Sequence, residues 1–237
     1  MKKNKLYFLL FILFSNISMS QNIKDKKVLV VWGGWEGHKP ELFATHVEKW
    51  LISQKADYII NNGLDIYDNY DELIKYDLII QSVTMSEISK NQEENLVKAI
   101  LNGVGIAGAH GGLVDSFRNS TNYQFMIGGQ WVSHPGGIIK YKVSMLDDEL
   151  TKGLSDFEIL SEQYYMHYDP NVKIIANTKF NGEVFPWIND VVMPIAWKKT
   201  YGKGKVFFIS IGHDPDEFML HKDGWELLTR GFLWAVR

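Results

Sequence analysis

The sequence GAHGG at residues 108–112 follows the apolar run VGIA at 104–107 and precedes a segment that can form a helix. This spacing is typical of a nucleophile elbow, a sharp strand-to-helix turn that lifts one side chain above the edge of a sheet. The surrounding glycines allow backbone angles and close approaches that larger residues would prevent. The raised residue is His110 instead of Ser or Cys, and an imidazole is a poor covalent nucleophile but a good metal ligand or proton carrier.

The first half of the chain alternates between strand-like and helix-like segments. Apolar runs typical of buried strands are found at 27–32 and 77–83, and a short strand is predicted at 57–61. Helices are predicted at 41–52, 71–76 and 89–103. With the strand that leads to His110, this βαβαβ order predicts a parallel, doubly wound sheet.

The second half of the chain favours antiparallel strands. Residues 138–145 alternate between apolar and polar side chains, as a half-buried strand does. Further strands are predicted at 158–163, 172–178, 191–197 and 205–211, with a hairpin turn at 201–204 and a closing helix at 225–236. Since no linker or internal repeat interrupts residues 21–237, we expect one α/β domain, mainly parallel, with an antiparallel β elaboration in its second half.

The amino terminus has the composition of a signal peptide. A basic start at residues 1–5 precedes an apolar segment at 6–14, and Ser18-Met19-Ser20 fits a cleavage site. We expect residues 1–20 to be removed, leaving an exported, periplasmic protein that begins at Gln21; an uncleaved anchor or a buried first strand is the alternative. The chain has no Cys, which excludes disulfides, Cys metal ligands and a lipid-modified thiol.

The net charge and the glycine pattern of the sequence argue against nucleic acids and nucleotides as partners. Removal of residues 1–20 lowers the count of basic residues from 25 to 22 against 28 acidic ones, a net charge of −6. No basic stripe is present, so we expect no nucleic acid partner, and no membrane contact after signal cleavage. The glycines at 33–37 match neither a P-loop nor a dinucleotide fingerprint, which excludes a nucleotide cofactor.

Three histidines each follow a predicted strand. His38, His110 and His213 should meet where the carboxyl ends of the strands form a crevice. Glu162 and His167 lie in a tyrosine-rich segment that can bind a metal or sugar hydroxyls, or can simply be the polar edge of a strand. His38, His110, Glu162 and His213 supply nitrogen and oxygen ligands suited to Zn²⁺ or a similar divalent ion.

Several motifs together resemble the trehalose-utilisation (ThuA-like) family. They are GGWEGH (33–38), AGAHGGL (107–113), MIGGQW (126–131) with HPGG (134–137), SEQYYMH (161–167), and KTYGKGK (199–205) with IGH (211–213). The resemblance implies a flavodoxin-like fold similar to class I glutamine amidotransferases. Where the amidotransferases have their catalytic Cys, this chain has His110, and the His near the end of their sequence corresponds to His213. Because the Cys is missing, the resemblance does not imply glutamine hydrolysis through a thioester. The resemblance further implies a role in sugar catabolism, including keto-sugars made by partner dehydrogenases.

These observations predict an exported enzyme that acts on a glycoside or 3-keto-glycoside by metal-assisted or acid/base hydrolysis, elimination or isomerisation. The predicted catalytic residues are His38, His110, Glu162 and His213. The predicted substrate-binding residues are Trp35, Gln130, Trp131, His134, Tyr165 and His167. The alternatives are a non-catalytic carbohydrate-binding protein, in which Trp35, Trp131 and Trp187 stack on sugar, and an accessory subunit of a sugar oxidoreductase. The sequence leaves the sugar, the metal and the oligomeric state open, a homo-oligomer included.

Overall fold

A computed structural model describes residues 22–237, so the predicted signal peptide lies outside the described residues. The strands are β1 (Lys27–Gly34), β2 (Asp57–Asn62), β3 (Leu78–Thr84), β4 (Gly105–Ala109), β5 (Gly129–Ser133), β6 (Ile138–Met145), β7 (Phe157–Glu162), β8 (Tyr165–Tyr168), β9 (Lys173–Lys179), β10 (Val192–Tyr201) and β11 (Gly204–Ile209). The α-helices are α1 (Pro40–Gln54), α2 (Tyr70–Leu73), α3 (Lys90–Leu101), α4 (Gly111–Val114), α5 (Thr121–Ile127), α6 (Glu217–Leu220) and α7 (Lys222–Ala235). Short 3₁₀ helices are η1 (Glu36–His38), η2 (Asp65–Asp68) and η3 (Pro186–Ile188).

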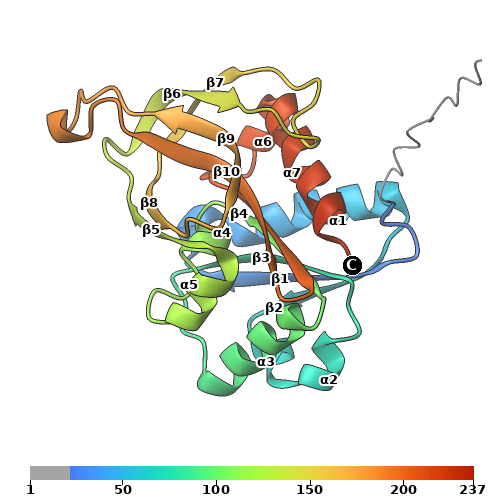
Figure 1. The fold of residues 1–237 in the computed structure, drawn as a ribbon. Coiled ribbons are helices and arrows are strands. Elements are labelled where there is room, and N and C mark those ends of the chain that lie inside the picture. Colours follow the sequence, from blue (N-terminus) through green and yellow to red (C-terminus); the bar gives the residue numbers. More distant parts are fainter. Residues whose placement is uncertain (1–21) are drawn as a thin grey trace, which may run out of the picture.

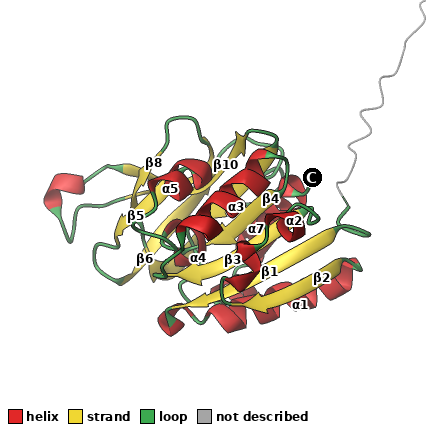
Figure 2. Cartoon of the chain, turned by 90° about the horizontal axis from the view of Figure 1, so that it is seen from below, coloured by secondary structure: helices red, strands yellow, loops and turns green. Residues whose placement is uncertain are grey.

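Nine strands form one mixed sheet in the order β2-β1-β3-β4-β11-β10-β9-β6-β7. The first five of these run parallel and have the flavodoxin-like order, with β1 and β3 at the point where the order reverses (Figures 1 and 2). The last four are antiparallel, and β5 pairs with β8 in a separate two-stranded ribbon. This architecture confirms the predicted fold class.

Both faces of β1, β3, β4 and β11 are buried, which explains their continuous apolar sequences, whereas the edge strand β2 is partly exposed. Val28 and Val30 of β1 pack with α1 and α7 on one face, whereas Leu29 and Val31 pack with α2, α3 and α5 on the other. Full burial of an aliphatic side chain stabilises the fold by about 1.5–3 kcal/mol, so these alternating contacts hold the helices against the sheet. The parallel strands are thereby fixed as a rigid support for the loops at their carboxyl ends.

Most boundary differences are small, but two have physical causes. The helix expected at 71–76 is the shorter α2, which begins after Asn69, whose side chain accepts a hydrogen bond from the amide of Glu72. The ribbon of β5 and β8 was not predicted, because its strands are only five and four residues long. Within residues 22–237, no helix is long and apolar enough to cross a membrane.

The antiparallel half of the sheet bends back toward the carboxyl edge of the parallel half. β7 lies five strands away from β4 in the sheet order. Nevertheless, Glu162 at the end of β7 lies 3.1 Å from His110, directly after β4. The bend therefore carries an acidic side chain to the strand ends where the predicted histidines emerge.

Candidate functional site

Loops that follow neighbouring parallel strands meet at one edge of the sheet. His38 ends η1 after β1, His110 follows β4, and His213 follows β11. Thr84 ends β3, which lies between β1 and β4. Ligands of open α/β sheets bind at this edge. The structure thus brings the three predicted histidines together, while their chemical roles stay predictions.

His110 occupies the elbow that its sequence motif predicts. β4 ends at Ala109, His110 has φ +51°, and α4 begins at the next residue. Such a backbone conformation costs on the order of 1–3 kcal/mol for a residue with a side chain and is frequent at functional sites. The next residue, Gly111, is required by space, because a Cβ there would lie 2.6 Å from the imidazole of His38.

Glu162 supplies one carboxylate to all three imidazoles. Its Oε2 atom lies 3.1 Å from Nε2 of His110 and 3.3 Å from Nδ1 of His213. The same oxygen lies 3.9 Å from Nε2 of His38. The four candidate ligand atoms all lie within 4.8 Å of one another. His38, His110 and Glu162 are buried, whereas the side chain of His213 is 25% exposed and can be reached from solvent.

Hydrogen bonds behind the imidazoles decide which nitrogen faces Glu162. Nδ1 of His110 donates to the carbonyl of Ser210 at 2.7 Å, so this nitrogen carries a hydrogen. In the neutral ring, Nε2 of His110 would therefore direct a lone pair at the Glu162 carboxylate. Nδ1 of His38 lies 3.2 Å from the hydroxyl of Thr84, which leaves its Nε2 to face the carboxylate. A cation, either a proton or a metal ion, removes the repulsion between the lone pair and the carboxylate.

Nδ1 of His213 is buried and has no hydrogen-bond partner within residues 22–237. Its contact with Oε2 of Glu162 is close but is not directed as a hydrogen bond. A buried polar nitrogen without a partner is costly, on the order of 1–3 kcal/mol. The nitrogen is therefore available to a ligand that approaches the cluster.

The pKa values of the cluster follow from burial and mutual contact. Burial, followed by the repulsion of His110 and His213, lowers the pKa of His38 to about 3. For Glu162, burial favours the neutral acid, but contacts with His110 and His213 outweigh it and hold the pKa well below its usual range. The contact with Glu162 raises the pKa of His213. At neutral pH the site therefore combines an ionised carboxylate with a neutral His38, both in forms that bind metal.

The donors fit a divalent metal ion. Imidazole nitrogens and carboxylate oxygens are usual ligands of Zn²⁺, and ligands of a four-coordinate ion lie roughly 3.3 Å apart. The contacts of 3.1–3.9 Å around Oε2 of Glu162 are close to this spacing. The carbonyl of Ser210 behind His110 provides the outer hydrogen bond that metal-binding histidines commonly make.

Aromatic and basic side chains surround the cluster. The ring of Tyr164 stacks on His110 at a centroid distance of 4.1 Å, and the ring of Trp35, 47% exposed, lies 4.9 Å from that of His38. Nε2 of His134 lies 3.6 Å from Oε1 of Glu162, the second carboxylate oxygen. The predicted binding residues Trp35 and His134 therefore border the cluster.

The sequence matches the family model described as trehalose utilisation, ThuA, over residues 27–235. The chain belongs to the ThuA family. This confirms the resemblance that the sequence motifs indicate and gives the protein a carbohydrate-related context. A comparison with curated protein sequences finds no match.

Solved structures of the ThuA family share the fold. A ThuA-like protein from Bacteroides uniformis has a TM-score of 0.73 and 18% identity, and the match covers 90% of this chain and 91% of that one. A ThuA-like protein from Parabacteroides merdae has a TM-score of 0.71 and 17% identity, with 90% of each chain covered. A β-galactosidase from Bacillus circulans has a TM-score of 0.55 and 12% identity over 92% of this chain but only 32% of its own. At these identities the matches establish the fold alone.

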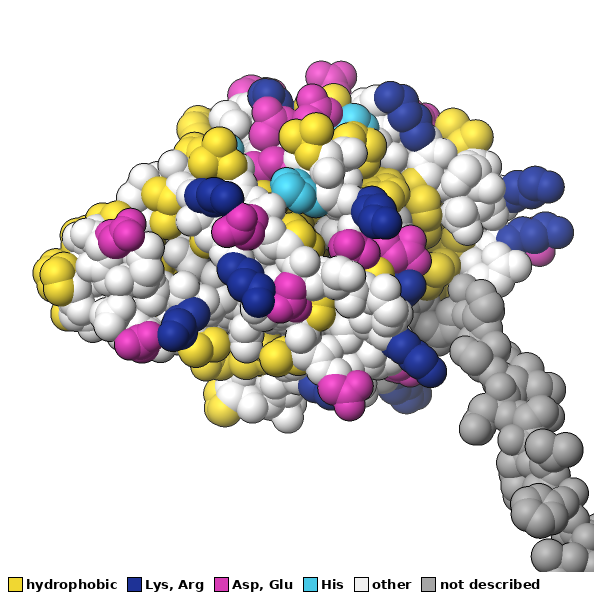
Figure 3. Space-filling model, turned by 90° about the horizontal axis from the view of Figure 1, so that it is seen from above, with side chains coloured by type: hydrophobic (Ala, Val, Ile, Leu, Met, Phe, Trp, Pro, Cys, Tyr) yellow, Lys and Arg dark blue, Asp and Glu magenta, His cyan; other side chains and the backbone are white. Residues whose placement is uncertain are grey.

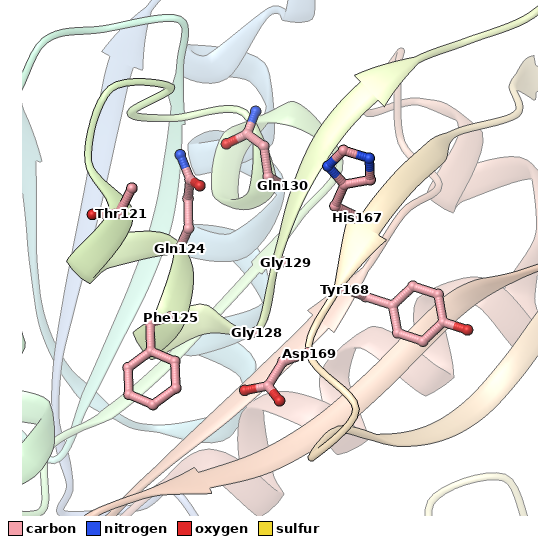
Figure 4. A pocket seen from close by; sticks show the side chains of 9 residues that line it. All are labelled: Thr121, Gln124, Phe125, Gly128, Gly129, Gln130, His167, Tyr168 and Asp169. Carbon is pink, nitrogen blue, oxygen red and sulfur yellow. The ribbon is translucent and has the colours of Figure 1, made fainter.

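The structure places three predicted binding residues of this ThuA domain away from the cluster. Gln130 and His167 are opposite each other in the ribbon of β5 and β8, and both line an open hollow of about 250 Å³ (Figure 4). Tyr165 packs beside Phe180 at a centroid distance of 5.9 Å. Trp131 alternates with Gln130 along β5 and lies on the other side of the ribbon, 5.7 Å from the ring of His134.

The three tryptophans predicted to stack on sugar differ in how accessible their rings are and in how close they lie to the histidines. The guanidinium of Arg118 lies over the ring of Trp131, 4.7 Å from its centroid. Trp187 is 76% exposed and stacks on Phe185 in the connection between β9 and β10. This connection projects from the body in Figure 1, and apolar side chains are visible at its tip in Figure 3. Trp35 is the predicted aromatic residue that is both exposed and next to the histidines.

Sequence reasoning missed four residues around the site. They are Thr84, Tyr164, Ser210 and Glu217. Ser210 acts through its backbone carbonyl, which no residue type reveals. Tyr164 is one of three tyrosines in the segment 164–168, and it lies in the connection between β7 and β8, whose course the sequence alone does not reveal.

Proposed function

We propose that this protein is an enzyme that acts on a glycoside or a 3-keto-glycoside at the cluster of His38, His110, Glu162 and His213. The observation that carries the proposal is the convergence of three imidazoles on one carboxylate oxygen, at which Nε2 of His110, the nitrogen without a hydrogen in the neutral ring, is directed. Such an arrangement needs a cation, and the family links the chain to sugar utilisation.

The cluster residues would hold a divalent ion, and His134 is left to move a proton. His38 and His110 are fixed from behind by Thr84 and Ser210, so they orient the carboxylate of Glu162. The Oε1 atom of Glu162 faces away from the cluster toward His134, whose side chain is 38% exposed. His134 can therefore contact both Glu162 and a substrate that enters from solvent. When bound, the ion would polarise a carbonyl oxygen of the sugar.

The ketone of a 3-keto-glycoside acidifies the neighbouring C–H bond. His134 accepts this proton, and the electron pair of the C–H bond moves into the sugar as the first step of either elimination or isomerisation. In elimination, the glycosidic C–O bond then breaks, and the departing oxygen takes a proton from solvent. Trp35 offers an apolar ring face to the sugar beside His38.

The test is an assay of the purified protein with matched glycosides and 3-keto-glycosides, before and after chelation. We expect turnover that is lost with the metal, and a loss of about a hundredfold in His134→Asn while the variant retains its metal. Full turnover in His134→Asn would remove its assigned role. Sugar binding that is indifferent to chelators and occurs without turnover would identify a binding protein instead.

We also propose that the protein is exported and begins at Gln21. The proposal rests on the basic start, the apolar segment and the Ser18-Met19-Ser20 site. Amino-terminal sequencing of protein from its native host should find Gln21 in the periplasmic fraction. An intact Met1 on cytosolic protein would contradict export.

A further inference from the structure

Glu217 is a buried carboxylate at the start of α6, close to His213 in the chain. Its Oε2 atom accepts a hydrogen bond from the amide of Gly212 at 3.0 Å, and its Oε1 atom accepts one from the amide of Asp214 at 3.3 Å. These two amides lie on either side of His213. One carboxylate therefore fixes the backbone on both sides of a histidine of the cluster.

The same carboxylate also reaches the strand that carries Glu162. The hydroxyl of Ser161 donates to Oε2 of Glu217 at 2.8 Å, and Ser161 directly precedes Glu162 in β7. Ser161 is fully buried and Glu217 is 8% exposed, so water competes little for these bonds. The adjacent backbone is held as well, because the hydroxyl of Tyr141 donates to the carbonyl of Glu162 at 3.2 Å.

We propose that Glu217 is the positioning residue that sets the separation of His213 and Glu162. The inference deepens the proposed function and rests on it only where metal affinity is concerned. Glu217 joins two segments that the chain brings from opposite halves of the sheet, the loop after β11 and the end of β7. The two segments also touch where the ring of His221 stacks on Phe157 of β7 at a centroid distance of 5.2 Å. The bonds of Glu217, however, lie directly beside His213 and Glu162 and so bear on their 3.3 Å contact.

A role limited to shaping the local turn would not need the link to β7. The loop already has its own internal bond, from the amide of Asp216 to Oδ1 of Asp214 at 3.1 Å. The bond from Ser161, 56 residues away in the chain, adds nothing to that turn. It does fix the distance between the loop and Glu162, which is what a shared ligand site requires.

Glu217→Gln tests the inference, because the amide keeps the size of the side chain. Its N–H group, however, faces at least one of the three groups that donate a hydrogen bond to Glu217, so that bond is lost. The matched control is Asp148→Asn, which removes another buried carboxylate outside the cluster. The first measurement uses metal-free protein and records NMR contacts between the rings of His38 and His213, whose centroids lie 5.2 Å apart. The second measures Zn²⁺ affinity by competition with a chromophoric chelator.

In wild-type protein and in Asp148→Asn we expect the ring contacts to be present. In Glu217→Gln we expect them to be lost, together with a roughly tenfold weaker affinity for Zn²⁺. Ser161→Ala should weaken Zn²⁺ binding by a similar factor, because it removes the bond that links Glu217 to β7. Ring contacts that persist in Glu217→Gln would overturn the inference, whether or not metal binds. Wild-type protein that shows the contacts but binds no Zn²⁺ would instead refute the metal site and leave the positioning role supported.

Discussion

Two clusters of charged and titratable side chains, one around the buried Asp148 and one around the buried Glu162, are built differently. In the Asp148 cluster, Nζ of Lys198 lies 2.9 Å from both Asp148 and Glu149, and Nζ of Lys173 lies 2.6 Å from Asp148. Two ammonium groups thus meet two carboxylates. In the histidine cluster, three imidazoles meet the single carboxylate of Glu162.

The difference lies in how the charges of the two clusters are balanced within the protein. Around Asp148 the charges of Lys173 and Lys198 balance the carboxylate within the protein, although Oδ2 of Asp148, like Nδ1 of His213, has no directed hydrogen bond within residues 22–237. In the histidine cluster three imidazoles share one carboxylate, the buried Nδ1 of His213 has no hydrogen bond, and Nε2 of His110, which bears no hydrogen in the neutral ring, faces the carboxylate. Such a set is satisfied only when a cation enters it.

The largest expected effect is on stability, from breaking the Asp148 cluster. Asp148→Asn should lower the free energy of unfolding by about 3 kcal/mol, because Lys198 loses one partner of a buried ion pair. Chemical unfolding of the variant measures this loss. Metal content should be unchanged, and a variant that loses its metal would show that the two clusters are not separate.

The next effect is on activity, from changing the histidine cluster. His110→Asn should lower turnover by roughly a hundredfold or more while the melting midpoint stays nearly unchanged. Asn tolerates the positive φ of this position, and its amide can replace Nδ1 in the bond to Ser210. Melting curves and rates are compared on the same preparation. An unfolded variant would mark His110 as a structural turn residue, and normal turnover would remove it from the site.

A smaller effect is expected on the pH dependence of stability, which should differ between the two clusters. The pKa of His38 is lowered in the folded protein to about 3, so below its usual value of 6.5 only the unfolded chain takes up this proton. Stability from His38 is therefore lost as the pH falls from about 6.5, at a rate of about 1 kcal/mol per pH unit.

The Asp148 cluster should respond only in stronger acid. Burial favours the neutral acid of Asp148, but hydrogen bonds and the contacts with Lys173 and Lys198 outweigh it and hold the pKa below 3.8, so its stabilisation is lost only as the pH falls below that value. Unfolding curves with chelator at pH 6.5, 5.5 and 4.5, all above the range in which Asp148 takes up a proton, separate the two clusters. His38→Gln should flatten the pH dependence and Asp148→Asn should not; the reverse pattern would contradict the assignment.

The smallest effect is expected from an exposed ion pair. Nζ of Lys140 lies 2.6 Å from Glu158, but both side chains are more than 60% exposed. Lys140→Ala should therefore change the free energy of unfolding by less than about 1 kcal/mol. If Lys140→Ala lowered the free energy of unfolding as much as Asp148→Asn does, charge pairing alone, and not burial, would account for the stability that the Asp148 cluster provides.

The sequence predicted the site in part, for reasons that differ between residues. His38, His110 and His213 could be placed together because each follows a strand, and the carboxyl ends of parallel strands share one edge. The position of Glu162 could not be derived in this way, because it depends on the bend that returns β7 to β4.

The residues that the structure places elsewhere were close neighbours in sequence of those at the site. Gln130 alternates with Trp131 along β5, so the two lie on opposite faces of the ribbon. The presence and register of that ribbon could not be read from its short strands. Glu217 was missed because its contacts join distant segments, and no local sequence pattern indicates such contacts.

Elemental analysis of protein purified without chelators or a His-tag tests the central claim most directly. The account predicts close to one divalent metal ion per chain in wild-type protein and in Asp148→Asn, and a clear loss in His110→Asn. The four ligand atoms within 4.8 Å of one another are the basis of this expectation. Metal-free wild-type protein with full turnover on its sugar substrate would contradict it.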